Sequence, residues 1–481
     1  MSDLSKIKIV LANVWSIPIK TPHFGLMSLA AYAREKIDNL EIQIIESEDP
    51  FEEILKAKPD IIGFASDTLA FLKTQKLAKK VKNEISCPIL IGGVHITALP
   101  NSFEKCFDVA IIGEAENTFV ELLKCFLNMR NFISDDLEKI KGIMYWQDGK
   151  KMQTERADLI ADIDKLPLVA RDLVPMEEYY LKDQFNLFGV KKLATLVTSR
   201  GCPYKCIFCG SPVQWGRVRW HSPEYVVDEI EFLFKKYKVD GIMFWDDLFI
   251  APKERLRKIV ELIKERGLDK KLTFFGYARA NLIDGDVCKL LKSINTRRLI
   301  FGFETGSQKI LNYLKKNSVS IEDNMRTVEL CRKYDITTSS GYIIGTPGEN
   351  VADLVATYKF MKKYPLDNTQ VYILTPYPGT ELWQDAEKKG LVSDKMDFNS
   401  LYVQLPVPGI VDYIKTERSD LLKGRIFLNK EFENNKDYIS LIYKIIKLAY
   451  VQNIKFYFKA LPKNLDLVKR IVLSKVKKIF R

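Results

Sequence analysis

The chain lacks three features that would define broad classes of protein. It has no run of eighteen or more apolar residues, so no segment reads as a membrane-spanning helix. It shows no signal-peptide pattern, and 8 cysteines in 481 residues is ordinary cytosolic usage, which disfavours a disulfide framework. No GxGxxG fingerprint follows the first expected strand, which disfavours nicotinamide and flavin dinucleotides. We therefore expect a cytoplasmic, globular protein.

Acidic residues are nearly absent from the C-terminal end. Residues 441–481 contain eleven Lys or Arg and a single acidic residue, Asp466, which gives a net charge of +10. The other 440 residues therefore carry only about +2 of the total charge of +12. Because the basic character belongs to one terminal element and no nucleic-acid recognition fold accompanies it, we do not expect nucleic acid as a partner.

The chain does have three cysteines close together. Cys202, Cys206 and Cys209 form a CxxxCxxC pattern in the stretch 200–209. Three thiolates on one loop can hold three irons of a four-iron cluster and leave the fourth iron without a protein ligand. The other five cysteines are isolated, which argues against a four-ligand zinc site and a two-cluster ferredoxin. The spacing indicates an iron–sulfur site with one iron open for chemistry.

At this motif the chain resembles the radical S-adenosylmethionine (SAM) superfamily. Phe208 supplies the aromatic residue that is usual before the third cysteine. The resemblance implies that the three cysteines bind a [4Fe–4S] cluster and that SAM chelates the open iron. It also implies reductive cleavage of SAM to methionine and a 5′-deoxyadenosyl radical, with an electron donor such as flavodoxin or ferredoxin as a partner.

Residues 6–130 alternate short apolar runs with helical patterns, with helices expected near 24–37, 69–85 and 116–128. The expected strands are Ile7–Asn13, Ile42–Glu46, Ile61–Ala65, Ile89–Ile91 and Val109–Ile112. Apolar runs without polar alternation indicate strands buried on both faces, and strand–helix alternation predicts a doubly wound, Rossmann-like α/β sheet. In such sheets ligands bind beyond the carboxyl ends of the strands.

The turns after these strands resemble those of the cobalamin-binding domain that precedes the barrel in one branch of radical SAM enzymes. The Asp-x-His-x-x-Gly motif whose histidine ligates cobalt in methionine synthase-type domains is absent. The resemblance therefore implies cobalamin held without a histidine below the metal. Capping of turns is the alternative role of His23 and His95. The candidate cobalamin-binding residues are Gly25, Leu26, Ser66, Gly92, Gly93, His95, Gly113 and Glu114.

A second strand–helix alternation runs from 193 to about 385 and predicts a partial (β/α)6 barrel with its chemistry at the carboxyl ends of the strands. The expected strands are Leu193–Thr198, Gly241–Trp245, Leu272–Tyr277, Arg298–Phe303, Ser340–Ile344 and Gln370–Leu374. The resemblance implies SAM contacts at their ends. The candidate SAM-binding residues are Asp246, Asp247, Arg279, Glu304, Gly341, Ile343 and Gly345.

Other roles stand beside these. Asp246 and Asp247 also suit helix N-caps, and the Gly-Gly-Glu motif that relatives use at this strand end to bind the SAM amino group is absent. Glu304 also suits an ion pair with Arg279 or Arg298. Arg279 suits either that pair or the carboxylate of SAM. The sequence decides none of these.

We predict four parts: a cobalamin-binding domain over 1–135, a connector over 136–190, a radical SAM barrel over 191–390 and an α-helical region over 391–481. A hairpin is expected at 142–149, and a helix at Glu417–Glu433. Apolar residues recur at helical spacing from Leu465 to Ile479 among basic ones, which indicates a basic amphipathic helix. Such a helix lies on an anionic membrane surface, making the protein peripheral there, or packs on the barrel with a solvated basic face; both interpretations stand.

Together the resemblances imply a cobalamin-dependent radical SAM enzyme. The leading hypothesis is methylation of an unactivated carbon. The first alternative is cyclisation, rearrangement or oxidation without methyl transfer, and the second is a non-catalytic cobalamin or cluster sensor. The sequence does not identify the organic substrate, for which a lipid and a natural product are both hypotheses.

Overall fold

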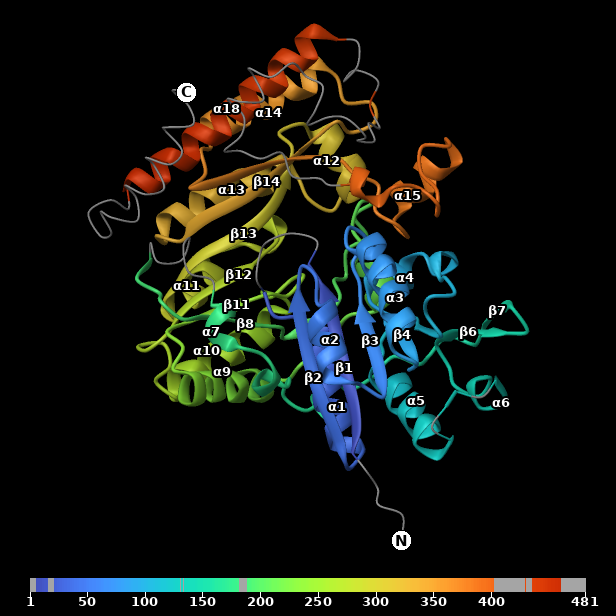
Figure 1. Ribbon diagram of the computed structural model, residues 1–481. Helices are drawn as coiled ribbons and strands as arrows, with labels where there is room; N and C mark the ends of the chain where they lie inside the picture. Colours follow the sequence, from blue (N-terminus) through green and yellow to red (C-terminus); the bar gives the residue numbers. More distant parts are fainter. Residues whose placement is uncertain are drawn as a thin grey trace.

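The computed structural model describes residues 6–15, 21–129, 131–132, 134–180, 188–401, 429 and 435–459, and it contains two α/β units (Figure 1). The first unit has a seven-stranded sheet in the order β2-β1-β3-β4-β5-β6-β7. Its parallel strands are β1 (Ile7–Val14), β2 (Leu40–Ser47), β3 (Ile61–Ala65), β4 (Ile89–Gly92) and β5 (Val109–Ile111). The expected hairpin, β6 (Ile143–Gln147) and β7 (Lys150–Gln153), pairs antiparallel with the β5 edge.

Helices cover both faces of this sheet. Successive residues of a strand point to opposite faces, and in these strands both sets of residues are apolar. Ile9 and Leu11 of β1 belong to the core on the α1 and α5 side, whereas Val10 and Ala12 belong to the core on the α2 and α3 side. The sheet is therefore doubly wound, as predicted. Its helices are α1 (Phe24–Lys36), α2 (Phe51–Ala57), α3 (Phe71–Glu84), α4 (Val94–Ala98) and α5 (Glu116–Met129). Two short helices, α6 (Ser134–Leu137) and α7 (Met176–Tyr179), lie in the segment that follows.

The second unit is a six-stranded parallel sheet in the order β15-β14-β13-β12-β11-β8, which confirms the predicted partial barrel. Its strands are β8 (Leu193–Leu196), β11 (Gly241–Phe244), β12 (Thr273–Tyr277), β13 (Thr296–Glu304), β14 (Thr337–Ile344) and β15 (Asn368–Ile373). A small antiparallel ribbon of β9 (Ser199–Arg200) and β10 (Arg219–Trp220) follows β8. The strands β8 and β15 form the two edges of the sheet.

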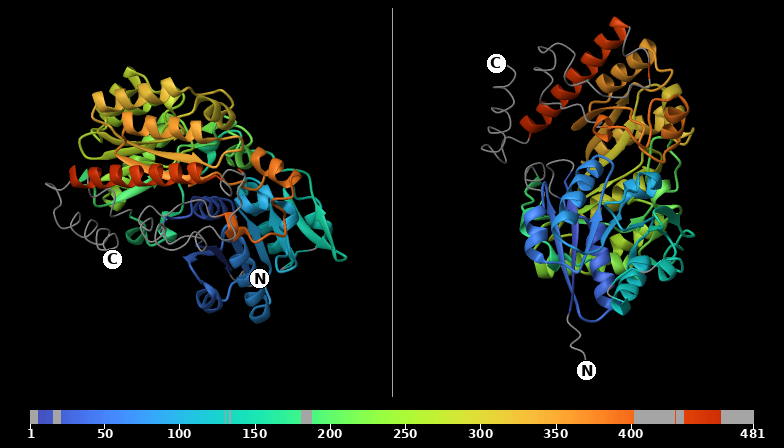
Figure 2. Two further views of the ribbon diagram at one scale, coloured as in Figure 1. Left: turned by 90° about the horizontal axis from the view of Figure 1, so that it is seen from above. Right: turned by 45° about the vertical axis from the view of Figure 1, so that its right-hand side comes forward.

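The outer helices of this unit pack an apolar face onto the sheet. They are α9 (Pro223–Tyr237), α10 (Lys253–Glu265), α11 (Gly285–Ser293), α12 (Gln308–Lys315), α13 (Ile321–Lys333) and α14 (Val351–Lys363). The short α8 (Ser211–Trp215) precedes them, and α15 (Glu381–Lys388) and the long α18 (Lys436–Lys459) follow. Figure 2 shows α18 lying along the barrel unit beside α14 in both further views.

No helix among the described residues is both long enough and apolar enough to cross a membrane. The helices expected at Glu417–Glu433 and over Leu465–Ile479 lie outside the described residues. The division of the chain at 135, 190 and 390 stays a prediction.

Candidate active site between two sheets

The three cysteines lie on the loop beyond the carboxyl end of β8, where a barrel places its chemistry. A tight turn joins two of them, since the N–H of Cys209 donates to the carbonyl of Cys206 at 3.1 Å. Ile207, one of the two residues between them, is fixed by two backbone hydrogen bonds: its N–H donates to the carbonyl of Leu314, and its carbonyl accepts from the N–H of Leu382, each at 3.1 Å. The loop is therefore held by α12 and α15, both remote in sequence.

The cysteine side chains suit a metal cluster better than free thiols. All three are half-buried, and burial raises the pKa of Cys202 and that of Cys209, the latter to about 12. Thiols in this environment need bound cations to become thiolates. Among the described residues, no three His, Cys, Asp or Glu side chains converge on a single ion site. This arrangement fits a four-iron cluster, in which the thiolates bind different irons.

A cavity of about 800 Å³ lies beside this loop, inside the barrel unit. All three cysteines contribute to its lining. So do five candidate SAM residues: Asp246, Asp247, Arg279, Glu304 and Gly341. Ile343 and Gly345 are not in the lining. The side chain of Ile343 packs in a cluster with Ile207 and Leu314, and Gly345 donates its N–H to Glu349 Oε2 at 2.7 Å.

The two aspartates after β11 hold neighbouring strands and helices rather than capping a helix, since the next helix, α10, begins after Pro252. Asp246 is buried, and its Oδ1 accepts from the backbone N–H of Thr198 and from the hydroxyls of Thr198 and Ser199 at 2.6–2.9 Å. Burial raises the pKa of Asp246 to about 6. Asp247 accepts from the Ser211 hydroxyl at 2.5 Å, which ties the cavity wall to α8.

Glu304 reaches the cavity through an unusual backbone conformation. Its φ is +63°, and the pairing of β13 with β14 shifts register between Gly302 and Glu304. A bulge of this kind re-aims a side chain, and a non-glycine residue with positive φ is a strain that clusters at functional sites. The carboxylate pairs with Lys315 Nζ at 3.1 Å, and Lys315 also donates to the Gly302 carbonyl. The partner of Glu304 is thus Lys315, not Arg279 or Arg298.

Arg279 braces the cysteine loop. Its guanidinium lies 3.7 Å from the centre of the Tyr204 ring and donates to Cys206 Sγ at 3.4 Å. It also donates to Asn281 Oδ1 at 3.0 Å and to the Ser318 hydroxyl at 2.5 Å. A fixed cation beside a cysteine stabilises negative charge on its sulfur.

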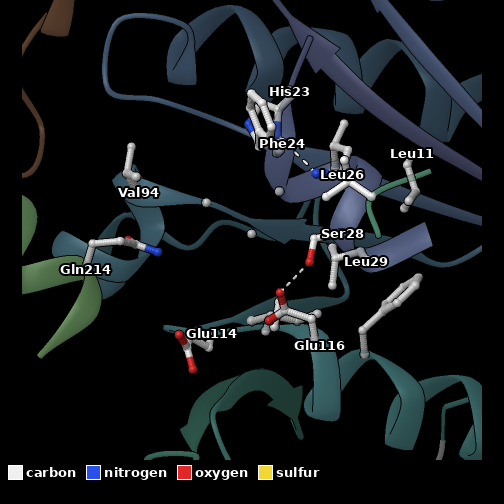
Figure 3. Close-up of a pocket in the computed structure, with 18 of the residues that line it drawn as sticks. Leu11, His23, Phe24, Leu26, Ser28, Leu29, Val94, Glu114, Glu116 and Gln214 are labelled. Carbon is white, nitrogen blue, oxygen red and sulfur yellow. Dashed lines mark hydrogen bonds between the residues drawn. The ribbon is translucent and has the colours of Figure 1, made fainter. Parts of the chain in front are cut away.

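A second cavity, of about 310 Å³, lies between the carboxyl ends of the first sheet and the barrel unit (Figure 3). Seven of the eight candidate cobalamin residues line it: Gly25, Leu26, Ser66, Gly92, Gly93, Gly113 and Glu114. The barrel side of the lining comes from side chains that the sequence reasoning did not single out: Arg200, Gln214, Trp215, His221 and Tyr225.

Glycines shape the sheet side of this cavity. Gly93 has a φ of +104°, and a Cβ there would come within 2.8 Å of the Ser66 carbonyl oxygen. Gly113 has a φ of +91° and faces open space. Because only glycine adopts these conformations readily, the loops after β4 and β5 present backbone without side chains at these positions, which a large flat ligand can approach closely. This surface fits the corrin ring of cobalamin.

The two N-terminal histidines are both engaged elsewhere. His95 is fully buried on Phe71 with ring centroids 4.0 Å apart, its Nδ1 lies 3.2 Å from the Thr68 hydroxyl, and burial lowers its pKa to about 3. It belongs behind the cavity wall and does not reach the cavity. His23 lines the cavity, but its Nδ1 accepts from the N–H of Leu26 at 3.2 Å and caps α1 (Figure 3). Turn capping, the alternative role considered for His23, is the one the structure shows.

A buried ion network joins the two units beside this cavity. Glu114 pairs with Arg219 at 2.6 Å and with Arg200 at 3.1 Å, and Glu116 pairs with Arg200 at 2.5 Å. The Ser28 hydroxyl donates to Glu116 at 2.8 Å (Figure 3). Burial alone raises the pKa of Glu116. The ion pair with Arg200 has the opposite effect and is stronger, so the pKa of Glu116 is lowered. The carboxylate of Glu114 therefore holds the two units together from the edge of the cavity.

The two cavities lie at opposite ends of α8. Cys209, in the lining of the first cavity, precedes this helix by two residues, and Gln214 and Trp215 at its other end line the second. The hydrogen bond from Ser211 to Asp247 fixes the start of the helix against the first cavity. One five-residue helix thus connects the cluster loop with the cleft between the units.

Comparison with known proteins agrees with this geometry. Residues 196–361 match the family model described as the radical SAM superfamily, and residues 10–123 match the B12 binding domain. The chain is 34% identical over 381 residues to an uncharacterized methyltransferase of Pyrococcus horikoshii, covering 77% of this chain and 80% of that protein. The chain belongs to the B12-binding radical SAM enzymes. Its cofactors are a [4Fe–4S] cluster, SAM and cobalamin.

Other similar proteins are more distant. The chain is 28% identical to an anaerobic magnesium-protoporphyrin IX monomethyl ester cyclase of Rubrivivax gelatinosus over 79% of this chain and 68% of that one. Its fold is similar to the radical SAM methyltransferase TsrM of Kitasatospora setae, solved with cobalamin and a [4Fe–4S] cluster bound. The TM-score is 0.65 at 18% identity, over 80% of this chain and 76% of that chain. The proteins in this comparison thus include methyltransferases and a cyclase.

Proposed function

We propose that this B12-binding radical SAM enzyme transfers a methyl group from cobalamin to an unactivated carbon of an organic substrate. The observation that supports it is the position of the cluster loop and the glycine-walled cleft at the two ends of α8. When bound, the cluster supplies the electron that cleaves SAM, and cobalamin supplies the methyl group. The candidate ligands are Cys202, Cys206 and Cys209 for the cluster. The strand-end residues already described are the candidates for SAM and cobalamin.

The protein's own residues hold these groups in place. The network of Glu114, Glu116, Arg200 and Arg219 fixes the first sheet against the barrel unit, so the cleft keeps one width. Trp215 lies over the Arg200 guanidinium at 5.4 Å and closes the cleft on the barrel side. Such closure excludes water from a site where reactive radicals must meet only their target.

Polar side chains of β14 and β15 in the first cavity indicate which kind of substrate binds there. Asn368, Gln370 and Tyr372 alternate along β15 and all face the cavity. Ser339 of β14 also lines it, and its buried hydroxyl has no hydrogen-bond partner among the described residues. A buried hydroxyl without a partner is unfavourable unless a ligand satisfies it. We therefore infer a substrate that carries hydrogen-bonding groups rather than a bare hydrocarbon.

The test uses the reconstituted holoenzyme under anaerobic conditions with a flavodoxin or ferredoxin reductant, SAM carrying a deuterated methyl group, and a cell extract separated into aqueous and organic phases. The proposal predicts a product that carries the deuterated methyl group, formed from the aqueous phase and only when cobalamin is supplied. A labelled product from the organic phase alone would overturn the inference about the substrate while leaving methyl transfer intact.

The relationship to a cyclase favours one other function, which is radical chemistry without methyl transfer. In that case the same incubation yields 5′-deoxyadenosine and a changed but unlabelled product. A cobalamin or cluster sensor would yield neither.

A further inference from the structure

The long helix α18 covers the open edge of the barrel sheet, where β15 has no further strand beside it (Figures 1 and 2). The side chain of Asn453 accepts from the backbone N–H of Thr369 at 2.7 Å and donates to the carbonyl of the same residue at 2.8 Å. Gln452 accepts from the Thr369 hydroxyl at 2.8 Å. One amide side chain thus occupies the backbone groups that a neighbouring strand would bind. The two neighbours of Thr369, Asn368 and Gln370, line the first cavity.

The start of the same helix reaches the loop at the end of β14. The Tyr438 hydroxyl donates to Glu349 Oε2 at 2.7 Å, and that oxygen also accepts the N–H of Gly345 at 2.7 Å. Tyr438 is fully buried and Glu349 is 1% exposed. The side-chain amide of Asn429 donates hydrogen bonds to the carbonyl oxygens of Thr346 and Glu349, with N–O distances of 2.8–2.9 Å. The loop 345–349 is therefore fixed by two residues, Asn429 and Tyr438, that follow it in sequence by more than 75 positions.

We propose that Tyr438 is a positioning residue of the SAM site: through Glu349 it fixes the Gly345 loop at the end of β14. Strand β14 carries Gly341 into the lining of the first cavity, and Gly345 takes a φ of +82° immediately beyond its end. Without the tyrosine hydroxyl, Glu349 Oε2 keeps the Gly345 N–H but loses the hydrogen bond that connects this carboxyl group to α18. The inference concerns SAM binding, which this family requires, and goes beyond the proposed methyl transfer.

The test compares the variant Tyr438→Phe with wild type in SAM cleavage, measured as 5′-deoxyadenosine formed by the reconstituted holoenzyme with dithionite. We expect the KM for SAM to rise about tenfold, the equivalent of one buried hydrogen bond to a carboxylate, with kcat nearly unchanged. The EPR spectrum of the reduced cluster without SAM should be unchanged, and its SAM-induced change should require correspondingly more SAM.

The same helix offers a matched control. The buried hydroxyl of Tyr450 has no hydrogen-bond partner among the described residues, so Tyr450→Phe removes a hydroxyl from α18 without removing a hydrogen bond. We expect Tyr450→Phe to keep the wild-type KM for SAM. Glu349→Gln retains an oxygen that can accept both hydrogen bonds and should restore most of the affinity that Glu349→Leu loses.

Equal KM values for SAM in Tyr438→Phe and Tyr450→Phe would overturn the proposal. So would a loss of thermal stability in Tyr438→Phe with an unchanged KM, because that result assigns the tyrosine to folding alone. Neither result bears on the methyl-transfer proposal, which depends on the deuterium-labelled product and not on the KM for SAM.

Discussion

The buried carboxylate of Glu114 gives the sharpest test of how the two units are held together. Its side chain is 3% exposed, and it binds Arg219 through both oxygens, at 2.6 and 2.7 Å, as well as Arg200 at 3.1 Å. In Glu114→Gln, Arg200 keeps its bond to Glu116. Arg219 then keeps the Ile160 carbonyl at 2.8 Å and can share with Arg200 the single amide oxygen of the glutamine, but it has no carboxylate partner among the described residues. The substitution therefore leaves one buried guanidinium without a carboxylate.

Breaking a buried pair in this way costs about 3–5 kcal/mol. We expect the free energy of unfolding of Glu114→Gln, measured by urea denaturation with tryptophan fluorescence, to fall by that amount. Cobalamin retention should fall with it, because the cleft has walls from both units. The matched control is Glu155→Gln: Glu155 is 83% exposed and pairs with Lys141 at 3.4 Å, so its loss should change stability by less than about 1 kcal/mol. Equal stability of the two variants would refute the reasoning.

Four further predictions follow from single features. Cys206→Ala should lose the [4Fe–4S] absorption and EPR signals; a wild-type cluster signal would contradict the ligand assignment. Gly93→Ala should lower the free energy of unfolding by about 1–3 kcal/mol in urea denaturation. Gly92→Ala should be nearly neutral, because its new Cβ would meet no atom closer than 3.9 Å. Equal effects of the two substitutions would refute the steric argument. Burial raises the pKa of Glu349 from 4.5 to about 7, so the folded protein favours the protonated carboxyl group and its stability falls as the pH rises between these values. In urea titrations, the free energy of unfolding of wild type should fall by about 3 kcal/mol more than that of Glu349→Gln between pH 4.5 and 7. Parallel pH curves for the two proteins would exclude this effect. A chain ending at Lys459, which keeps α18, should float less with anionic liposomes than the full chain if the basic tail binds membranes, and equal flotation would exclude that interpretation.

The sequence predicted the features that depend on local pattern. The apolar runs of both sheets became parallel strands, the three cysteines lie on the loop after β8, and the candidate glycines at the ends of β4 and β5 line the second cavity. The strands could be predicted because strand burial follows from a few neighbouring residues, and the strand ends then located the cysteines and the glycines. The strand ends thus identified residues that line both cavities, although the sequence does not show how the two units pack together.

The partners of the charged residues could not be predicted in this way. Glu114 and Arg219 are 105 residues apart and meet only because two separately folded sheets pack together. Lys315 is close to Glu304 in sequence, but α12 must fold back onto β13 before the two side chains touch. His95 has the sequence context of a ligand-binding turn, yet it lies in the first turn of α4 and points into the core beside Phe71. Side-chain direction at a loop depends on tertiary packing, which the local pattern does not encode.

The central claim is that the cluster and cobalamin occupy the two ends of α8. Five helical residues span about 7.5 Å, so two paramagnets at its ends are close enough to interact. The most direct measurement is EPR spectroscopy of the enzyme loaded with both the reduced cluster and cob(II)alamin. We expect splitting or broadening of both EPR signals when the two groups are loaded together, and neither effect when either group is loaded alone. A spectrum equal to the sum of the two separate signals would contradict it.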